Sequence, residues 1–413
     1  MEIKKKSFNY ADSIFTIGQN PIRKIRYFIF LKDVFILSLT AFGGPQAHLA
    51  MFLKLLVIKR AYITEEELME LQAFCQVLPG PTSTQTLTAI AFKIGGPNLA
   101  YLSLFIWIAP SAIFMTALGI SMDYFQDNHI SLSFVRFLPA IAIGLVIYAG
   151  FNMGQKILTN STSFLLAFIT AAIAFFFQSP FTTPLIIVLG GVITGLKYKN
   201  LSKKDIKDKL DINWSNFILF LTVPIIAAII GAITHWLPVR LFENFYRNGS
   251  LLFGGGQVLT SILFTEFVQF KHYLTSEEFL SGWAMVQVAP GPVFSYAAFI
   301  GSLSMRNYGT SGEISGSIMA VTGIFLPGTF LIFFVFRFWE QLKQYRIVRA
   351  SLEGIKAAGV GLTAAASLIL LSQLQVNPVN YLIVIITFCL LQFTKANPPL
   401  LIIIGLICGF FIK

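Results

Sequence analysis

The sequence predicts an all-α, polytopic membrane protein with two inverted-topology repeats, each with two broken or re-entrant helical segments and four continuous transmembrane helices. The first of three observations behind this prediction is composition: of 413 residues, 55% are hydrophobic and only 12% are charged, and the mean hydropathy is +0.73. Soluble domains carry about 25% charged residues, so this chain has too little polar surface to be soluble. The other observations are a duplicated set of motifs and a series of apolar runs of roughly the 20 residues that one crossing needs.

The repeat is visible in short motifs that recur 211 positions apart. FGGPQ at 42–46 returns as FGGGQ at 253–257, and QVLPGP at 76–81 returns as QVAPGP at 287–292. Without a gap, 15 of the 40 positions in 42–81 match at this offset. Chance would match only a few of them, so we infer two copies of one unit.

Each repeat begins with two interrupted segments. In the first copy, one segment is broken at Gly43-Gly44-Pro45 and the next, which starts at Glu65, is broken at Pro79-Gly80-Pro81. Proline removes a backbone donor and glycine costs backbone entropy, so both break helices. The expected interrupted segments are 28–58, 65–93, 240–270 and 275–304. The expected continuous helices are 98–122, 134–156, 163–178 and 181–197, then 310–338, 345–371, 378–393 and 397–412.

Basic residues outside the apolar runs predict the orientation. The N-terminal KKK and RKIR runs and the basic linker should face the cytoplasm, so the net charge of +11 indicates the positive-inside rule rather than a nucleic-acid partner. One connecting helix between two equal halves inverts the second, a layout common among secondary transporters. The expected parts are a cytoplasmic N-terminal segment (1–24), the first repeat (25–197), a basic cytoplasmic linker (198–212), the connecting helix (213–238) and the second repeat (239–413).

The breaks suggest an anion-binding site. Non-helical backbone at membrane depth is tolerated where it is buried in protein or lines a wet cavity. A helix that starts after Pro81 or Pro292 presents free N–H groups and the positive end of its dipole, and several such starts near the midplane would bind an anion. Kinks that merely allow close packing are the alternative. The candidate substrate-binding residues are Gly43, Gly44, Gln46, Gln76, Gly80, Thr82, Ser83, Thr84, Gly254, Gly255, Gln257, Gln287, Gly291, Ser295 and Tyr296.

Charged residues inside apolar runs are candidates for coupling or for charge pairs, because such residues are costly in a membrane. They are Lys54, Glu266, Glu353 and Lys356. Glu353 and Lys356 are three positions apart and can neutralise each other on one helix face. Glu67 and Glu278 each follow a threonine by three positions, which predicts a capping box, with a proton-coupling carboxylate as the alternative.

Metal and catalytic chemistry find no support in the sequence. The four histidines share no metal-ligand spacing, and loop or packing roles are favoured for them: His48, His129, His235 and His272. The three cysteines lie in apolar stretches without such spacing. We therefore expect no metal, no cofactor and no catalytic residue. A membrane-embedded enzyme and a non-transporting scaffold remain the alternatives from other classes.

Four stretches, FGGPQAHLAMF, FCQVLPGPTSTQ, FGGGQVLTSIL and VQVAPGPVFSYAAFIG, resemble the chromate ion transporter (CHR) family in its long two-domain form, and the resemblance covers nearly the whole chain. It implies chromate export that confers chromate resistance, with sulfate as a competing analogue. The matching positions are Phe42, Gly43, Gly44, Gln46, Gln76, Pro79, Gly80 and Pro81, with Phe253, Gly254, Gly255, Gln257, Gln287, Pro290, Gly291 and Pro292 in the second copy. Gly256 stands where the first copy has Pro45, so the two break sites need not be equivalent.

The expected partners follow from this resemblance and from the composition. They are a small inorganic oxyanion such as chromate and the lipid bilayer of the cytoplasmic membrane, with the N-terminus in the cytoplasm. Import rather than export, sulfate or another oxyanion as substrate, and a homodimer all remain open at this stage.

Overall fold

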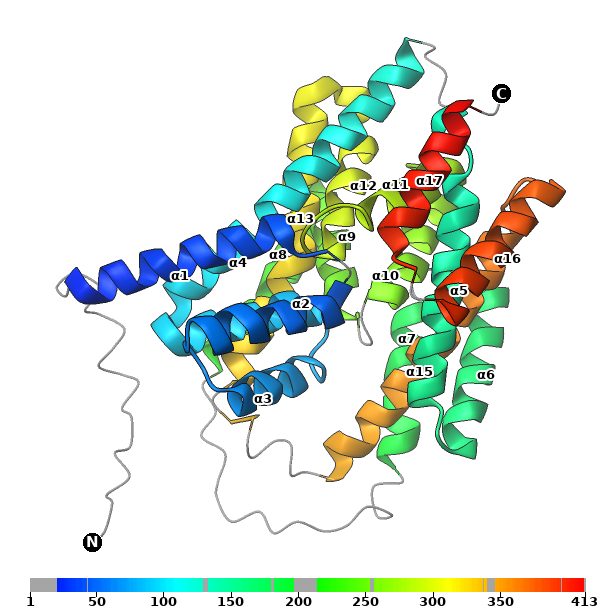
Figure 1. Ribbon diagram of the computed structural model, residues 1–413. Coiled ribbons are helices and arrows are strands. Elements are labelled where there is room, and N and C mark those ends of the chain that lie inside the picture. The colour runs from blue at the N-terminus through cyan, green and yellow to red at the C-terminus, as the bar shows by residue number, and fades with distance from the viewer. Residues whose placement is uncertain are drawn as a thin grey trace, which may run out of the picture.

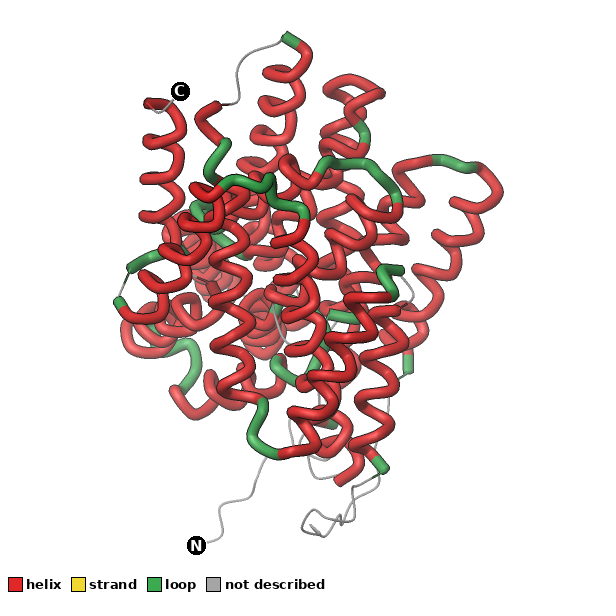
Figure 2. The backbone as a smooth tube through the Cα atoms, turned by 90° about the vertical axis from the view of Figure 1, so that its right-hand side faces the viewer, coloured by secondary structure: helices red, strands yellow, loops and turns green. Residues whose placement is uncertain are grey.

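The computed structural model describes residues 21–42, 44–128, 133–179, 182–196, 214–252, 256–336, 338–339, 346–394 and 396–411. Within these ranges the chain is helical and has no strand (Figure 2). Among the described residues, five helices are long and apolar enough to cross a membrane, and six shorter apolar helices accompany them. The expected linker 198–212 and most of the expected segment 1–24 lie outside the described residues.

The outward faces of these helices are apolar. Phe168, Ile233 and Phe393 are each about three-quarters exposed, at 74%, 75% and 78%. A protein surrounded by water rarely exposes large contiguous apolar patches, so these faces are suited to lipid contact. The chain is an all-α polytopic membrane protein, as its composition predicted.

The first half begins with short helices and continues with longer ones. Its elements are α1 (Pro21–Thr40), α2 (Gly44–Phe52), the π-helix η2 (Leu53–Lys59), α3 (Glu65–Cys75), α4 (Thr82–Asp127), the 3₁₀ turn η3 (Ser133–Val135), α5 (Leu138–Ile157), α6 (Ser161–Phe176) and α7 (Thr182–Gly195), followed by α8 (Ser215–Thr234). Gly96 has a φ of 76° inside α4, so this helix consists of two parts, 82–95 and 97–127. Proline cannot donate to the preceding turn, so Pro97 supports a break at this point.

The second half repeats this order. Its elements are α9 (Leu237–Ser250), α10 (Gly256–Leu263), the π-helix η5 (Phe264–Phe270), α11 (Ser276–Val286), η6 (Val293–Ser295), α12 (Tyr296–Ser304), η7 (Arg306–Tyr308), α13 (Gly309–Val335), α15 (Arg346–Ser372), α16 (Pro378–Phe393) and α17 (Pro398–Phe411). The bounds of η5 and α11 equal those of η2 and α3 when they are shifted by 211 positions. Local structure is therefore duplicated where the sequence is duplicated.

The helices of the two halves mix in two groups. In the first bundle, α13 packs on α4, α8, α9 and α12, and α1 packs on α4. In the second bundle, α15 packs on α5, α6 and α7, while α5 also packs on α16 and α17. The second bundle lies on the right of Figure 1 and the first on the left. Between them, α10 contacts α15 and α11 contacts both α5 and α12, so each bundle contains elements of both halves.

Candidate functional site

The two Pro-Gly-Pro breaks each contact the opposite half of the chain. The Gly80 amide donates to the Leu252 carbonyl at 2.7 Å, and the Gly291 amide donates to the Ala41 carbonyl at 2.8 Å. Ala41 and Leu252 directly precede the two Phe-Gly-Gly motifs, and the two bonds are related by the 211-position offset. Each Pro-Gly-Pro break therefore lies beside the end of the helix that leads into the other half's Gly-Gly break.

Glycine is required at the centre of both Pro-Gly-Pro breaks. Gly80 has a φ of 120° and Gly291 a φ of 100°, which residues with a Cβ rarely adopt. A Cβ on Gly80 would lie 2.7 Å from the Gln85 amide nitrogen. That nitrogen donates to the Pro79 carbonyl at 2.6 Å and so holds the turn in place.

Both breaks lie at the tip of a helical hairpin. In the first hairpin, Glu67 at the start of α3 pairs with Lys93 near the end of the first part of α4, at 2.8 Å. In the second, Glu278 of α11 pairs with Arg306 just beyond α12, at 2.6 Å. The 11 residues of α3 span only about 16 Å, too little to cross a core of about 30 Å. Each hairpin therefore begins and ends at the same side of the molecule.

The helix starts at the base of the hairpins are capped, and those at the tips are not. The capping boxes predicted at the starts of α3 and α11 are both present. Neither Pro81, before α4, nor Pro292, before η6, supplies a side-chain cap. Unsatisfied amides at a buried helix start call for another partner, such as water or a solute.

Glu67 has a structural role in its hairpin. A hydrogen bond from Lys93, supported by one from the Thr64 amide, lowers the pKa of the Glu67 carboxyl. A carboxyl stabilised in its charged form carries protons poorly near neutral pH. Capping therefore accounts for this residue better than proton coupling does.

His48 of α2 lies beside the uncapped start of α4. The side chain is 1% exposed, and its Nδ1 lies 3.0 Å from the Ser83 hydroxyl. The Ala41 carbonyl, which accepts the Gly291 amide, also interacts with this ring. Among the described residues, no hydrogen bond of normal geometry reaches Nε2. No local sequence signal separates His48 from the other histidines, because its neighbours here are distant in the chain.

The polar surroundings of His48 occur in one half only. Trp107 packs edge-on against the ring at 5.2 Å between centroids and donates to the Thr84 hydroxyl at 3.1 Å. The positions that correspond to His48 and Ser83 in the second half are Leu259 and Phe294. The two breaks are therefore chemically different, and the first offers more hydrogen-bonding groups.

The sequence-predicted binding residues occupy several environments. Ser83, Thr84, Gly80, Gly291, Ser295 and Tyr296 are buried; Gly44, Thr82 and Gln287 are half-buried; and Gln76 is exposed. The Tyr296 hydroxyl is already bonded to the Phe279 carbonyl. Gly43, Gly254 and Gly255 lie outside the described residues, as do the side chains of Gln46 and Gln257.

Several buried polar atoms near the breaks have no hydrogen-bond partner within the described part of the chain. They are His48 Nε2, Gln85 Oε1, Ser111 Oγ and Ser295 Oγ. Ser111 lies against the second break, since a Cβ on Gly291 would come 3.1 Å from its Cβ. Buried polar atoms in native proteins are nearly always satisfied, so this region is suited to water or a polar solute.

Of the four charged residues predicted inside apolar runs, one is buried and the other three are exposed or half-buried. Glu266 is 1% exposed, and Arg247 donates to both of its oxygens at 3.0 Å, with Lys271 at 3.6 Å. This carboxylate therefore has its counter-ions. Lys54 and Glu353 are exposed and Lys356 is half-buried, and the ion pairs among described residues do not join Glu353 to Lys356.

Two cavities lie near the start of α11, between the two bundles. One of about 310 Å³ is lined by Gln126, Arg136, Glu277 and Glu278, among others, and one of about 550 Å³ by Gln269, His272 and Arg306, among others. Neither is lined by residues of the breaks. They mark a separate polar region at one end of the molecule.

Comparison with known proteins identifies the family. The chromate transporter family model matches residues 28–196 and again residues 239–410. The chain belongs to the chromate transporter family. An uncharacterized transporter of Methanocaldococcus jannaschii is 23% identical over 95% of both chains. A probable chromate transport protein of Synechococcus elongatus is 26% identical over 90% of this chain and 92% of its own. A chromate transport protein of Cupriavidus metallidurans is 22% identical over 96% of both. No solved structure matches the chain.

Proposed function

We propose that this protein exports chromate and binds the dianion between the two Pro-Gly-Pro breaks. One observation carries the proposal: the reciprocal hydrogen bonds from Gly80 to Leu252 and from Gly291 to Ala41. They link the two uncapped helix starts through both halves of the chain. A helix start binds an oxyanion with free amides and a partial positive charge, without any charged side chain. Of two relatives that match 90% or more of this chain, one is named a chromate transport protein and the other a probable chromate transport protein.

The first break supplies most of the donors in this proposal. The amides at the start of α4, the Thr84 hydroxyl and His48 Nε2 would surround the anion. With the proton on Nε2, His48 Nδ1 accepts from the Ser83 hydroxyl, which orients the ring. A neutral set of donors suits a carrier, because the dianion must leave as readily as it binds. A lysine or arginine in direct contact would hold a dianion more strongly.

The two halves are proposed to cross the cytoplasmic membrane in opposite directions, with the N-terminus inside. The odd connecting helix α8 and the basic segments support this orientation. Transport would then proceed by alternating access, with the second bundle moving against the first around the breaks.

The membrane potential favours export. Moving one charge through 100 mV is worth about 2.3 kcal/mol, so a dianion leaving a cell that is negative inside gains roughly twice that. Export therefore needs no further energy source, whereas uptake would need one.

Transport of labelled chromate into proteoliposomes, with and without an imposed potential, tests this function. We expect flux that rises with a potential positive on the receiving side and that sulfate reduces by competition. Absence of chromate flux under every potential would refute the proposal. Flux of sulfate alone would assign the protein to a different oxyanion.

Replacing His48 tests its place in the site. His48→Asn should raise the chromate concentration for half-maximal flux by roughly 10- to 100-fold, because a hydrogen bond to a charged group contributes about 1.5–3 kcal/mol. The matched control is His235→Asn, since His235 is exposed and has a φ of 53° that asparagine tolerates. Equal half-saturation in both variants and the wild type would exclude His48 from the site.

A further inference from the structure

Glu313 of α13 is a buried carboxyl without an ion-pair partner. It is 2% exposed, and its hydrogen bond within the described chain is a long one, from the Ser302 hydroxyl at 3.4 Å. The ion pairs formed by the described residues do not include it. A buried carboxylate without a cation is costly, so a structural role alone does not account for Glu313.

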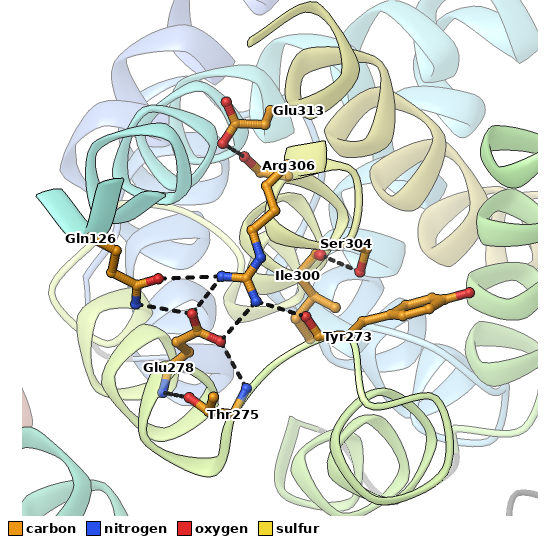
Figure 3. A network of polar contacts seen from close by, with 9 residues as sticks. Gln126, Tyr273, Thr275, Glu278, Ile300, Ser304, Arg306 and Glu313 are labelled. Atoms are coloured by element: carbon orange, nitrogen blue, oxygen red, sulfur yellow. Dashed lines mark hydrogen bonds and ion pairs between the residues drawn. The ribbon is translucent and has the colours of Figure 1, made fainter. Parts of the chain in front are cut away.

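The cation that interacts with Glu313 is already paired with another carboxylate. The titratable groups that interact with Glu313 are Asp123 and Asp127 of α4 and Arg306 of η7. Arg306 is the cation among them, and it binds the two Glu278 oxygens at 2.6 and 3.4 Å. In Figure 3, Arg306 lies between Glu278 and Glu313.

Further contacts hold Arg306 toward Glu278. Its Nη2 donates to the Tyr273 carbonyl at 3.1 Å, and Gln126 of α4 donates to Glu278 at 3.0 Å (Figure 3). The adjacent Glu277 accepts a 2.7 Å hydrogen bond from Gln375, which follows α15 of the second bundle. The start of α11 therefore carries both the Glu278–Arg306 pair and, at the adjacent Glu277, a hydrogen bond to the second bundle.

Buried hydroxyls extend from Glu313 toward the breaks. Ser302, which contacts Glu313, is seven residues from Ser295, or about 10 Å along a helix. Ser317, one turn beyond Glu313, bonds with Thr116 of α4 at 2.7 Å. Ser111, five residues before Thr116, lies against Gly291. Polar side chains of α4, α12 and α13 therefore lie between Glu313 and the second break.

We propose that Glu313 is the proton-binding site that couples proton entry to oxyanion export, an inference that rests on the proposed function. While the Glu313 carboxyl holds its proton, it is neutral and Arg306 stays with Glu278. When the proton leaves for the opposite side, the carboxylate competes for Arg306. The Glu278–Arg306 pair then opens, and with it the contact of α11 with the second bundle. One proton is bound and released per cycle, and no other bond is made or broken.

The membrane potential drives both charge movements of this cycle. A dianion that leaves and a proton that enters both move with a negative-inside potential. With the potential clamped at zero, one coupled proton makes a pH gradient of one unit sustain a roughly tenfold chromate gradient, because one pH unit is a tenfold ratio. Chromate should accumulate on the acidic side.

Proteoliposomes with an acidic lumen and clamped zero potential test the coupling. The wild type should accumulate labelled chromate about tenfold in the lumen, with proton movement that a pH-sensitive dye records. Glu313→Gln resembles the protonated carboxyl and keeps the Glu278–Arg306 pair closed, so both the accumulation and the downhill flux of chromate should be lost in protein that still inserts. The matched control is Glu66→Gln, since Glu66 is an exposed carboxyl on α3, and it should behave like the wild type.

The outcomes separate the two proposals. No chromate flux from the wild type under an imposed potential would refute the transport function itself. Chromate flux that ignores the pH gradient, or tenfold accumulation by Glu313→Gln, would overturn the role of Glu313 alone. If Glu313→Gln does not insert, Glu313→Asp takes its place. This variant keeps a carboxyl and should accumulate chromate, and loss of accumulation with intact downhill flux would contradict the inference.

Discussion

Alanine at Gly80 or at Gly291 should each lower chromate flux by at least about tenfold while the protein still inserts in the membrane. Both glycines have φ values, 120° and 100°, that cost an L-residue about 1–2 kcal/mol. At Gly80 the added Cβ also displaces the Gln85 side chain, which then loses its bond to the Pro79 carbonyl. The turn relaxes, and its amide moves away from the opposite half of the chain.

A strained glycine outside the breaks serves as a control that separates loss of the break geometry from general loss of stability. Gly96 has a φ of 76°, and a Cβ there would meet no atom within 4 Å. Gly96→Ala carries a similar backbone cost but lies at the kink of α4, away from the breaks. We expect its flux per inserted molecule to stay within about threefold of the wild type, because the cost falls on stability rather than on the site. The measurement is flux in proteoliposomes, normalised to inserted protein. Equal losses in Gly96→Ala and Gly80→Ala would mean that lost stability, and not the break geometry, limits transport.

Helix positions were predictable because their causes are local. Apolar runs and the prolines beside them predicted helices at 98–122 and 378–393, and the structure has 97–127 and 378–393. The Pro-Gly-Pro breaks and the capping boxes were equally readable, since each depends on residues within one turn. The repeat located their second copies at the correct offset.

The relations between the halves were not predictable in the same way. Nothing local in the sequence pairs Gly80 with Leu252 or mixes the helices into two bundles. The sequence favoured a loop or packing role for His48 and did not single out Glu313, because the roles proposed for both residues depend on neighbours that the fold supplies. Gln76 was predicted to bind substrate from its place beside a motif; its side chain is exposed in the structure, and its role in binding stays a prediction. Proximity to a motif does not determine where a side chain points.

The two hairpin ion pairs offer a comparison of the same contact in two environments. Glu278 is 3% exposed in its pair with Arg306, whereas Glu67 and Lys93 are each 36% exposed. Arg306→Ala leaves a buried carboxylate without its cation, which should lower the free energy of unfolding by about 3–5 kcal/mol. Lys93→Ala should lower it by less than about 1 kcal/mol, because water screens an exposed pair.

Thermal unfolding of the purified protein in detergent measures this difference, and a double variant assigns its cause. The fall in Tm should be several times larger for Arg306→Ala than for Lys93→Ala. Adding Glu278→Gln to Arg306→Ala should recover much of the loss, because the amide no longer buries a charge but still accepts from Gln126. Equal falls in the two single variants would mean that water from the adjacent cavities solvates Glu278 fully. The Glu278–Arg306 pair would then be too weak to hold Arg306 away from Glu313, and the switch proposed between the two carboxyls would lose its physical basis.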